Sequence, residues 1–258
     1  MPKHYDVIVV GAGIIGSMVA RCLSRYDLKI LLIEKESDIC TGATAANSAL
    51  IHGGYDALPG SLKAEMNVKG NAAWEQLSQE LQFPFERRGT YVVAIGAEER
   101  PRLDELAARA EVNGVPVELI SGAEMLKREP LINPEVSGAL YAPTGGICDP
   151  WAVTIAAAEN AVLNGVELRL DTEFEDFIWE GEEARRRESE KARRRESEKA
   201  RRRESEKARR RIVGIQTNRG AFSCRWVINA AGLFADEVMH KAGVRPEFKI
   251  TARRGEYY

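Results

Sequence analysis

The 258-residue sequence predicts an α/β protein. We expect a three-layer unit with a parallel sheet in the middle, and a second, α+β unit built on an antiparallel sheet. Two observations predict this class. At the N-terminus, short β-branched apolar runs alternate with helical periodicity, which is typical of buried parallel strands joined by helices. Between residues 81 and 144, short strand-like runs alternate with amphipathic helical segments, which favours a separate sheet with its own helices.

The first predicted elements are a strand over residues 5–10 and a helix over residues 14–23. Gly11, Gly13 and Gly16 lie at this junction with GxGxxG spacing. In such a junction the first glycine permits a tight turn and the second lets the backbone approach a diphosphate. The third lets the helix pack closely on the strand. The start of the helix also offers free N–H groups and a partial positive charge to phosphates.

Residues 29–33 predict a second buried strand, which ends at Glu34, eighteen residues after Gly16. A carboxylate at this position can accept hydrogen bonds from both hydroxyls of an adenosine ribose. It would repel a 2′-phosphate, which argues against NADP. The strand, glycine turn, helix and acidic residue together predict a dinucleotide site, but they do not separate FAD from NAD.

Residues 40–71 carry the pattern N-S-x-x-x-H-x-G-Y-x-x-x-P-G-x-L-K-A, from Asn47 to Ala64. Three further stretches accompany it: GGICDPWAVTIAAAENAVLNGVEL (145–168), VINAAGLFAD (227–236) and ITARRGEYY (250–258). Together they resemble the D-amino-acid-oxidase-like superfamily of FAD-dependent oxidoreductases. Within it they look most like anaerobic-type glycerol-3-phosphate dehydrogenases and L-2-hydroxyglutarate dehydrogenases. The resemblance implies FAD as cofactor and a three-layer, Rossmann-like FAD-binding domain.

The resemblance also implies which residues line the FAD. They are Gly11, Gly13, Ile15, Gly16, Glu34, Lys35, Thr44, Asn47, Ser48, His52, Gly53, Phe174, Ala230, Ala231 and Gly232. Backbone near Phe174 is expected to meet the adenine. Residues 230–232 follow a predicted strand and present backbone with almost no side chain, so a flat or charged ligand can come close. Two small-residue turns in one sheet predict a ligand across the carboxyl ends of its strands.

His52 is the candidate catalytic residue, since the resemblance puts its segment beside the isoalloxazine ring. In one interpretation it is a general base, or a hydrogen-bond partner for the substrate hydroxyl. In the other it only positions the cofactor. Tyr55, Arg254 and Tyr257 are candidate contacts to an anionic substrate, because an arginine can bind two oxygens of a carboxylate or phosphate at once. Alternatively, Arg254 is a solvated strand residue.

We expect a discontinuous FAD-binding domain over residues 1–80 and 145–245, and a partial substrate domain over 81–144 and 246–258. The members of this superfamily continue beyond residue 258, so the chain is expected to be truncated at its C-terminus.

Several local elements can also be predicted. Residues 61–81 predict a helix with Leu62, Met66, Trp74, Leu77 and Leu81 toward a core. Residues 85–96 predict one strand. Ser121 predicts a helix N-cap, with Glu124 at the capping-box position.

The unit ARRRESEK occurs three times from residue 184, followed by a partial fourth copy. Residues 184–211 carry a net charge of +9. Because the whole chain carries −2, the rest of the chain carries −11. We expect the segment 183–211 to be an insert at a β-hairpin tip, where insertions are tolerated. An eight-residue period places no apolar stripe on a helix. Without interleaved aromatic residues, no specific nucleic-acid partner is expected.

Composition adds few constraints. No apolar run approaches the roughly 20 residues of a membrane span, and the N-terminus does not read as a secretory signal. A cytoplasmic location is expected, with peripheral attachment to the inner face of the membrane as a variant. Cys22, Cys40, Cys148 and Cys224 form no CxxC pair, so free buried thiols are expected and no metal site.

The sequence therefore predicts a FAD-dependent dehydrogenase that takes a hydride from a hydroxyl-bearing carbon and passes electrons to an unknown acceptor. Glycerol 3-phosphate is the leading substrate. The alternatives are an L-2-hydroxy acid such as 2-hydroxyglutarate, an amine, a catalytically inactive FAD-binding fragment, and a binding module that acts through its basic arm.

Overall fold

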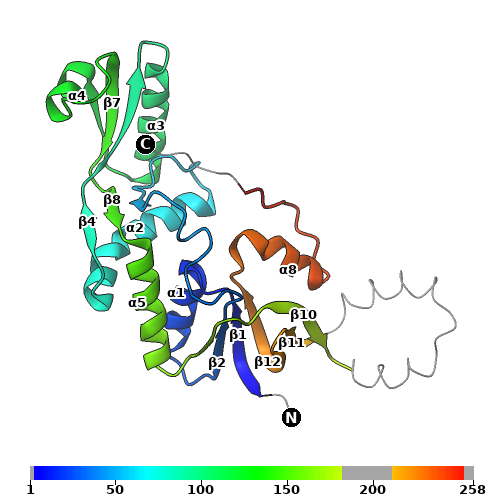
Figure 1. Cartoon of the computed structure of the whole chain (residues 1–258). Coiled ribbons are helices and arrows are strands. Elements are labelled where there is room, and N and C mark those ends of the chain that lie inside the picture. Colours follow the sequence, from blue (N-terminus) through cyan, green and yellow to red (C-terminus); the bar gives the residue numbers. More distant parts are fainter. Residues whose placement is uncertain (1–2, 182–210, 253–258) are drawn as a thin grey trace. The chain divides into compact units, whose positions relative to one another are not determined.

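The computed structural model describes residues 3–181 and 211–252, which fall into two compact units (Figure 1). The first unit combines residues 1–47 with 150–258, and the second spans 48–149. In chain order the first contains β1 (His4–Val10), α1 (Ile14–Leu23), β2 (Ile30–Ile33), α5 (Pro150–Leu163), β9 (Glu167–Arg169), β10 (Phe174–Trp179), β11 (Ile212–Thr217), β12 (Gly220–Asn229), the 3-10 turn η1 (Gly232–Phe234) and α8 (Ala235–Lys241).

The sheet of the first unit has the strand order β10-β11-β12-β1-β2-β9. The four strands β12, β1, β2 and β9 are parallel, whereas β10, β11 and β12 are joined antiparallel. Val10 is in register with both Asn229 and Ile33, so β1, β2 and β12 end together. The loops that follow these three strands therefore meet at one edge of the sheet.

Both faces of the parallel strands are buried, which makes this a three-layer unit. Val7 and Val9 of β1 face a core completed by α1 and α5, and Ala20 of α1 is fully buried there. Ile8 and Val10 face the opposite core, to which β10, β11 and α8 contribute. Alternating side chains of one strand thus enter two cores, which explains why β1 reads as a continuous apolar run. The predicted α/β class is confirmed.

Glu167 at the start of β9 links the N-terminal ends of β9 and β1. Its carboxylate accepts a hydrogen bond from Tyr5 Oη at 2.9 Å and pairs with Lys3 and Arg169. Partial burial raises the pKa of Glu167, but the hydrogen bonds from Lys3, Arg169 and Tyr5 outweigh it and lower the pKa to about 2.

This shift predicts a pH-dependent stability. Because the folded-state pKa lies below the unfolded value of about 4.3, the stabilisation is complete above that value and is lost as the pH falls toward 2. We expect Glu167→Gln to lose ~1 kcal/mol of unfolding free energy at pH 7, after allowance for solvent screening. Urea titrations should show this loss shrinking below about pH 4. A difference that is constant with pH would contradict the assignment.

The second unit holds two three-stranded antiparallel sheets, with orders β3-β8-β4 and β5-β7-β6. Its elements are β3 (Leu50–Ile51), α2 (Leu62–Leu81), β4 (Phe85–Arg87), β5 (Thr90–Ile95), α3 (Arg100–Asn113), β6 (Glu118–Ser121), α4 (Gly122–Arg128), β7 (Val136–Ala142) and β8 (Gly146–Cys148). Ser121 Oγ accepts a hydrogen bond from Glu124 N at 3.2 Å, which confirms the predicted N-cap.

The domain boundaries differ from the predicted ones. Residues 48–80 belong to the second unit, because α2 packs on α3 and β4 and its side chains bond loops of that unit. Residues 246–252 group with the first unit and form no strand.

Three local predictions were also wrong. Gly89, with φ +72°, divides the expected strand 85–96 into β4 and β5, which pair with different partners. Leu62 and Met66 are exposed, at 70% and 48%, because the buried positions of α2 are Ala64, Asn71 and Leu81. Cys22 is exposed, since it lies on the outer side of α1.

The insert position can be judged from its flanks. β10 and β11 pair antiparallel up to Trp179 and Ile212, and Glu180 N donates to Arg211 O at 3.0 Å. These contacts close a hairpin at the point where the repeat begins and ends. The repeat itself, over 182–210, lies outside the described residues. Among the helices that the structure describes, none combines the length and hydropathy needed to cross a membrane.

Candidate functional site

The glycine turn after β1 has the close packing that the motif predicts. Gly11 has φ +99°, a conformation that favours glycine, and a Cβ placed on it would lie 2.6 Å from Ala230 O. A Cβ placed on Gly16 would lie 1.8 Å from Gly11 O. The first turn of α1 can therefore rest on the glycine loop only because residue 16 has no side chain.

Polar groups from two other loops contact this turn. Glu34 Oε2 accepts a hydrogen bond from Ala12 N at 2.9 Å, and its Oε1 accepts one from Glu36 N at 3.2 Å. Thr44 Oγ1 accepts a hydrogen bond from Ile14 N at 3.1 Å. The carboxylate and the hydroxyl thus lie at the edge of the glycine loop and at the start of α1, as the nucleotide hypothesis requires.

The small-residue turn after β12 lies directly beside the glycine loop. Ala230 N donates to Val10 O at 2.9 Å, and Ala231 N donates to Asn229 Oδ1 at 3.2 Å. Farther along, the Phe234 ring lies 4.1 Å from Lys35 Nζ. The two turns are neighbours because β1 and β12 are adjacent parallel strands.

The segment before β10 runs along the end of β2. Thr172 N donates to Glu34 O at 2.8 Å, and Asp171 N donates to Glu36 O at 2.9 Å. These bonds bring the chain leading to Phe174 to the same edge as Glu34. This placement supports the prediction that backbone near Phe174 meets an adenine.

The first unit therefore brings together most of the predicted cofactor residues. Ile15 is 66% exposed in the first turn of α1, and Asn47 Nδ2 donates to Thr44 O at 2.6 Å, which braces the loop that carries Thr44. Backbone without side chains, a helix N-terminus and a carboxylate hydrogen-bonded to the edge of the turn are groups that suit a dinucleotide. The residues present fit FAD, which these groups would hold along the carboxyl edge of the sheet.

Glu34 offers a direct test of this fit. We expect Glu34→Ala to weaken FAD binding about 10- to 100-fold, because hydrogen bonds to a charged group contribute about 1.5–3 kcal/mol. Fluorescence titration of the apoprotein with FAD measures the change. Glu36→Ala, which removes an exposed neighbouring carboxylate, serves as the matched control. Equal affinities in the two variants would contradict the ribose assignment.

His52, Gly53 and Tyr55 belong to the second unit, and Ser48 begins it. His52 is exposed and directly follows β3. Gly53 is buried, and a Cβ placed on it would lie 2.7 Å from Thr144 Oγ1. The imidazole is therefore accessible, while the backbone beside it is tightly packed.

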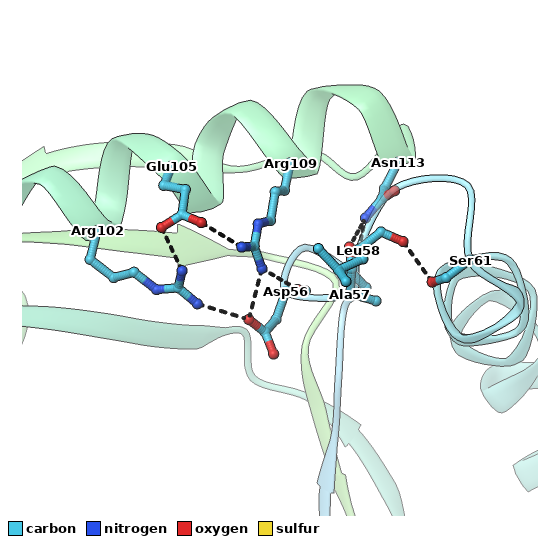
Figure 2. Close-up of polar contacts among 9 residues, drawn as sticks. Asp56, Ala57, Leu58, Ser61, Arg102, Glu105, Arg109 and Asn113 are labelled. Atoms are coloured by element: carbon cyan, nitrogen blue, oxygen red, sulfur yellow. Dashed lines mark hydrogen bonds and ion pairs between the residues drawn. The ribbon is translucent and has the colours of Figure 1, made fainter. Parts of the chain in front are cut away.

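Helix α3 holds the loop that follows His52 (Figure 2). Asn113 Nδ2 donates to Gly54 O at 3.0 Å and to Ala57 O at 2.9 Å. Arg109 Nη1 donates to Asp56 O at 3.1 Å, and Arg102 pairs with the Asp56 carboxylate at 3.4 Å. Side chains of one helix thus satisfy the main-chain carbonyls of a loop that has no strand partner there.

Glu105 joins the two arginines of this cluster. It accepts a hydrogen bond from Arg102 at 2.6 Å and also contacts Arg109 (Figure 2). The hydrogen bond from Arg102 is the main reason why the pKa of Glu105 is lowered. The charges keep both guanidinium groups oriented toward Asp56.

Of the three predicted substrate residues, the structure describes Tyr55 alone. Tyr55 is only 8% exposed and packs among Leu103, Leu106 and Val115, and burial raises its pKa. This position gives no support to a substrate contact. Arg254 and Tyr257 lie outside the described residues.

Sequence reasoning missed Asn71 and Asn113, the two carboxamides that hold the His52 loop. An asparagine at an inward position of a helix was the signal that could have revealed Asn71.

Comparison with known proteins places this site in a family. A family model described as "FAD dependent oxidoreductase" matches residues 6–258. A glycerol 3-phosphate dehydrogenase of Caloramator mitchellensis is 40% identical over 98% of this chain and 47% of its own length. A mitochondrial L-2-hydroxyglutarate dehydrogenase of Caenorhabditis briggsae is 33% identical over the whole chain and 54% of its own length.

Among solved structures, the dithionite-reduced, FAD-bound L-alpha-glycerophosphate oxidase of Mycoplasma pneumoniae matches with a TM-score of 0.76 and 28% identity. The match covers 93% of this chain and 57% of that one. The chain thus spans about half the length of the curated relatives it matches. The family match over residues 6–258 and the fit of the glycine loop to FAD lead to one conclusion: the chain belongs to the family of FAD-dependent oxidoreductases.

Proposed function

We propose that this chain is the FAD-binding part of a dehydrogenase that oxidises glycerol 3-phosphate at a hydroxyl-bearing carbon. The 40% identity with the glycerol 3-phosphate dehydrogenase of Caloramator mitchellensis, over 98% of the chain, is the observation that carries the proposal. FAD, when bound, supplies the hydride acceptor. The residues of this chain bind the FAD and accept the proton of the substrate.

In this proposal the first unit holds the cofactor through the glycine loop, Glu34 and residues 230–232. His52 accepts the proton of the substrate hydroxyl as the C–H bond breaks, which is the usual task of a general base. Its exposure on the second unit leaves the imidazole free to meet a ligand. Arg254 remains the predicted contact for the phosphate, because its guanidinium matches an anionic group.

Purified protein tests the proposal in two stages. A yellow protein with flavin absorbance is expected, and a colourless protein unchanged by added FAD would contradict cofactor binding. Under anaerobic conditions, glycerol 3-phosphate should bleach the flavin while L-2-hydroxyglutarate should not. If neither compound bleaches a flavin that dithionite does reduce, an amine substrate is tested next. A flavin that amines also leave oxidised would mean that the chain is an inactive FAD-binding fragment.

An L-2-hydroxy acid is the second candidate substrate. The 33% identity with the L-2-hydroxyglutarate dehydrogenase of Caenorhabditis briggsae favours it, and bleaching by L-2-hydroxyglutarate alone would establish it. The electron acceptor and peripheral attachment at the inner face of the membrane stay predictions.

The basic repeat has its own test. We expect deletion of residues 184–208 to leave FAD binding and flavin reduction within about twofold of the full chain, because loop tips tolerate changes in length. Salt-dependent binding to DNA or to anionic vesicles that disappears with the deletion would instead favour the basic-arm module.

A further inference from the structure

The carboxamide of Asn71 on α2 joins the His52 segment to a distant turn of the same unit. Asn71 is only 6% exposed. Its Nδ2 donates to His52 O at 2.9 Å and to Thr144 O at 2.9 Å. Both hydrogens of the NH2 group are therefore used, one on each segment.

Arg87 determines which way this carboxamide points. Arg87 Nη1 donates to Asn71 Oδ1 at 2.9 Å, and Nη2 donates to Asn71 O at 2.9 Å. Arg87 is itself held by Glu75, through an Nε hydrogen bond of 2.6 Å to Oε1. With its oxygen facing the guanidinium, the carboxamide must present its NH2 group to the two carbonyls.

The backbone around His52 is held mainly by groups from outside its own segment: Asn71 bonds His52 O, and Asn113 bonds Gly54 O. His52 follows a strand of only two residues and precedes Gly53 and Gly54, and Gly54 has φ +101°. Glycines have the widest conformational freedom of any residue. The position of the imidazole therefore depends on tethers from outside the segment, and Asn71 provides the one at His52 itself.

We propose that Asn71, oriented by Arg87, is a positioning residue that holds His52 at the place where it acts on the substrate. The proposal rests on the proposed function, in which His52 takes the substrate proton. A general base works only within hydrogen-bond reach of the proton it removes, so a small displacement of the His52 backbone costs rate. FAD binding, which the first unit provides, should not depend on Asn71.

Asn71→Asp is the sharpest test, because the carboxylate has the same shape and keeps a partner for Arg87 but loses both N–H donors. Arg87→Lys, which loses the planar fork that orients the carboxamide, is the second variant should the first fail to fold. Ser137→Ala is the matched control. It removes a half-buried hydroxyl that donates to Ala94 O at 3.2 Å and contacts Gly96 O. This hydroxyl lies in the same unit, but at the far end of β7 from the Thr144 turn.

Two measurements decide the proposal. In hydrogen exchange of the protein without substrate, the peptide covering residues 50–58 should exchange at least about tenfold faster in Asn71→Asp and Arg87→Lys than in Ser137→Ala. In stopped-flow experiments, flavin reduction at saturating substrate should slow at least about tenfold in the same two variants. The dissociation constant for FAD should stay within about twofold of the wild-type value.

Unchanged exchange of the 50–58 peptide, or a reduction rate equal to that of Ser137→Ala, would overturn the proposal. If no substrate reduces the flavin of the wild-type protein, the proposed function fails. The exchange result then still decides whether Asn71 holds the His52 segment, so the two failures can be told apart.

Discussion

Replacing Gly16 with alanine is expected to reduce FAD affinity more than 100-fold and to cost about 1–3 kcal/mol of unfolding free energy. The new Cβ would lie 1.8 Å from Gly11 O, which is a backbone atom and cannot rotate away. Helix α1 must therefore move off the glycine loop, and the N–H groups at its start lose their alignment with the diphosphate. FAD titration by fluorescence and thermal unfolding of the apoprotein measure the two effects.

Gly70→Ala is the control for this experiment. Gly70 lies inside α2 with an ordinary helical φ, and beyond its neighbours in the helix no atom lies within 4 Å of the position that its Cβ would take. Alanine there should leave FAD affinity unchanged and stabilise the protein by roughly 0.5–1 kcal/mol, since glycine weakens a helix interior. Wild-type FAD affinity in Gly16→Ala would show that the cofactor does not lie on this loop.

His52→Ala is expected to slow flavin reduction by about 10²- to 10⁴-fold, which is the usual contribution of a general base. Because His52 lies on the second unit and is exposed, the substitution removes no core packing, and the unfolding temperature should not change. Anaerobic stopped-flow reduction by glycerol 3-phosphate measures the rate.

The control is His240→Ala, which removes an exposed histidine of α8. Its reduction rate should equal that of the wild-type protein. If His52→Ala keeps the wild-type rate with FAD bound, His52 is not the base. If it loses FAD instead, the histidine positions the cofactor, which is the other interpretation that the sequence leaves open.

The sequence by itself determined the first unit in most respects. The strand at 5–10, the helix at 14–23 and the role of Gly16 depend on local spacing, and close neighbours in the chain carry that information. Family resemblance identified FAD, and the family match confirms it. The sequence also predicted the hairpin that flanks the repeat, because apolar and polar residues alternate on both sides of it as they do in strands. β10 and β11 pair antiparallel at this place.

Only the tertiary structure decided how the His52 segment is held. Asn71 donates to carbonyls that lie 19 and 73 residues away in the chain, and Asn113 donates to carbonyls 59 and 56 residues away. No local pattern predicts such pairings. The motif around Tyr55 predicted a contact to the substrate, but packing against residues of α3 buries this side chain in a core. Local spacing predicts helices and strands because residues that are close in the sequence are also close in space. Hydrogen bonds between distant segments depend on how the helices and strands pack, and that packing is determined by the whole sequence together rather than by any one stretch of it.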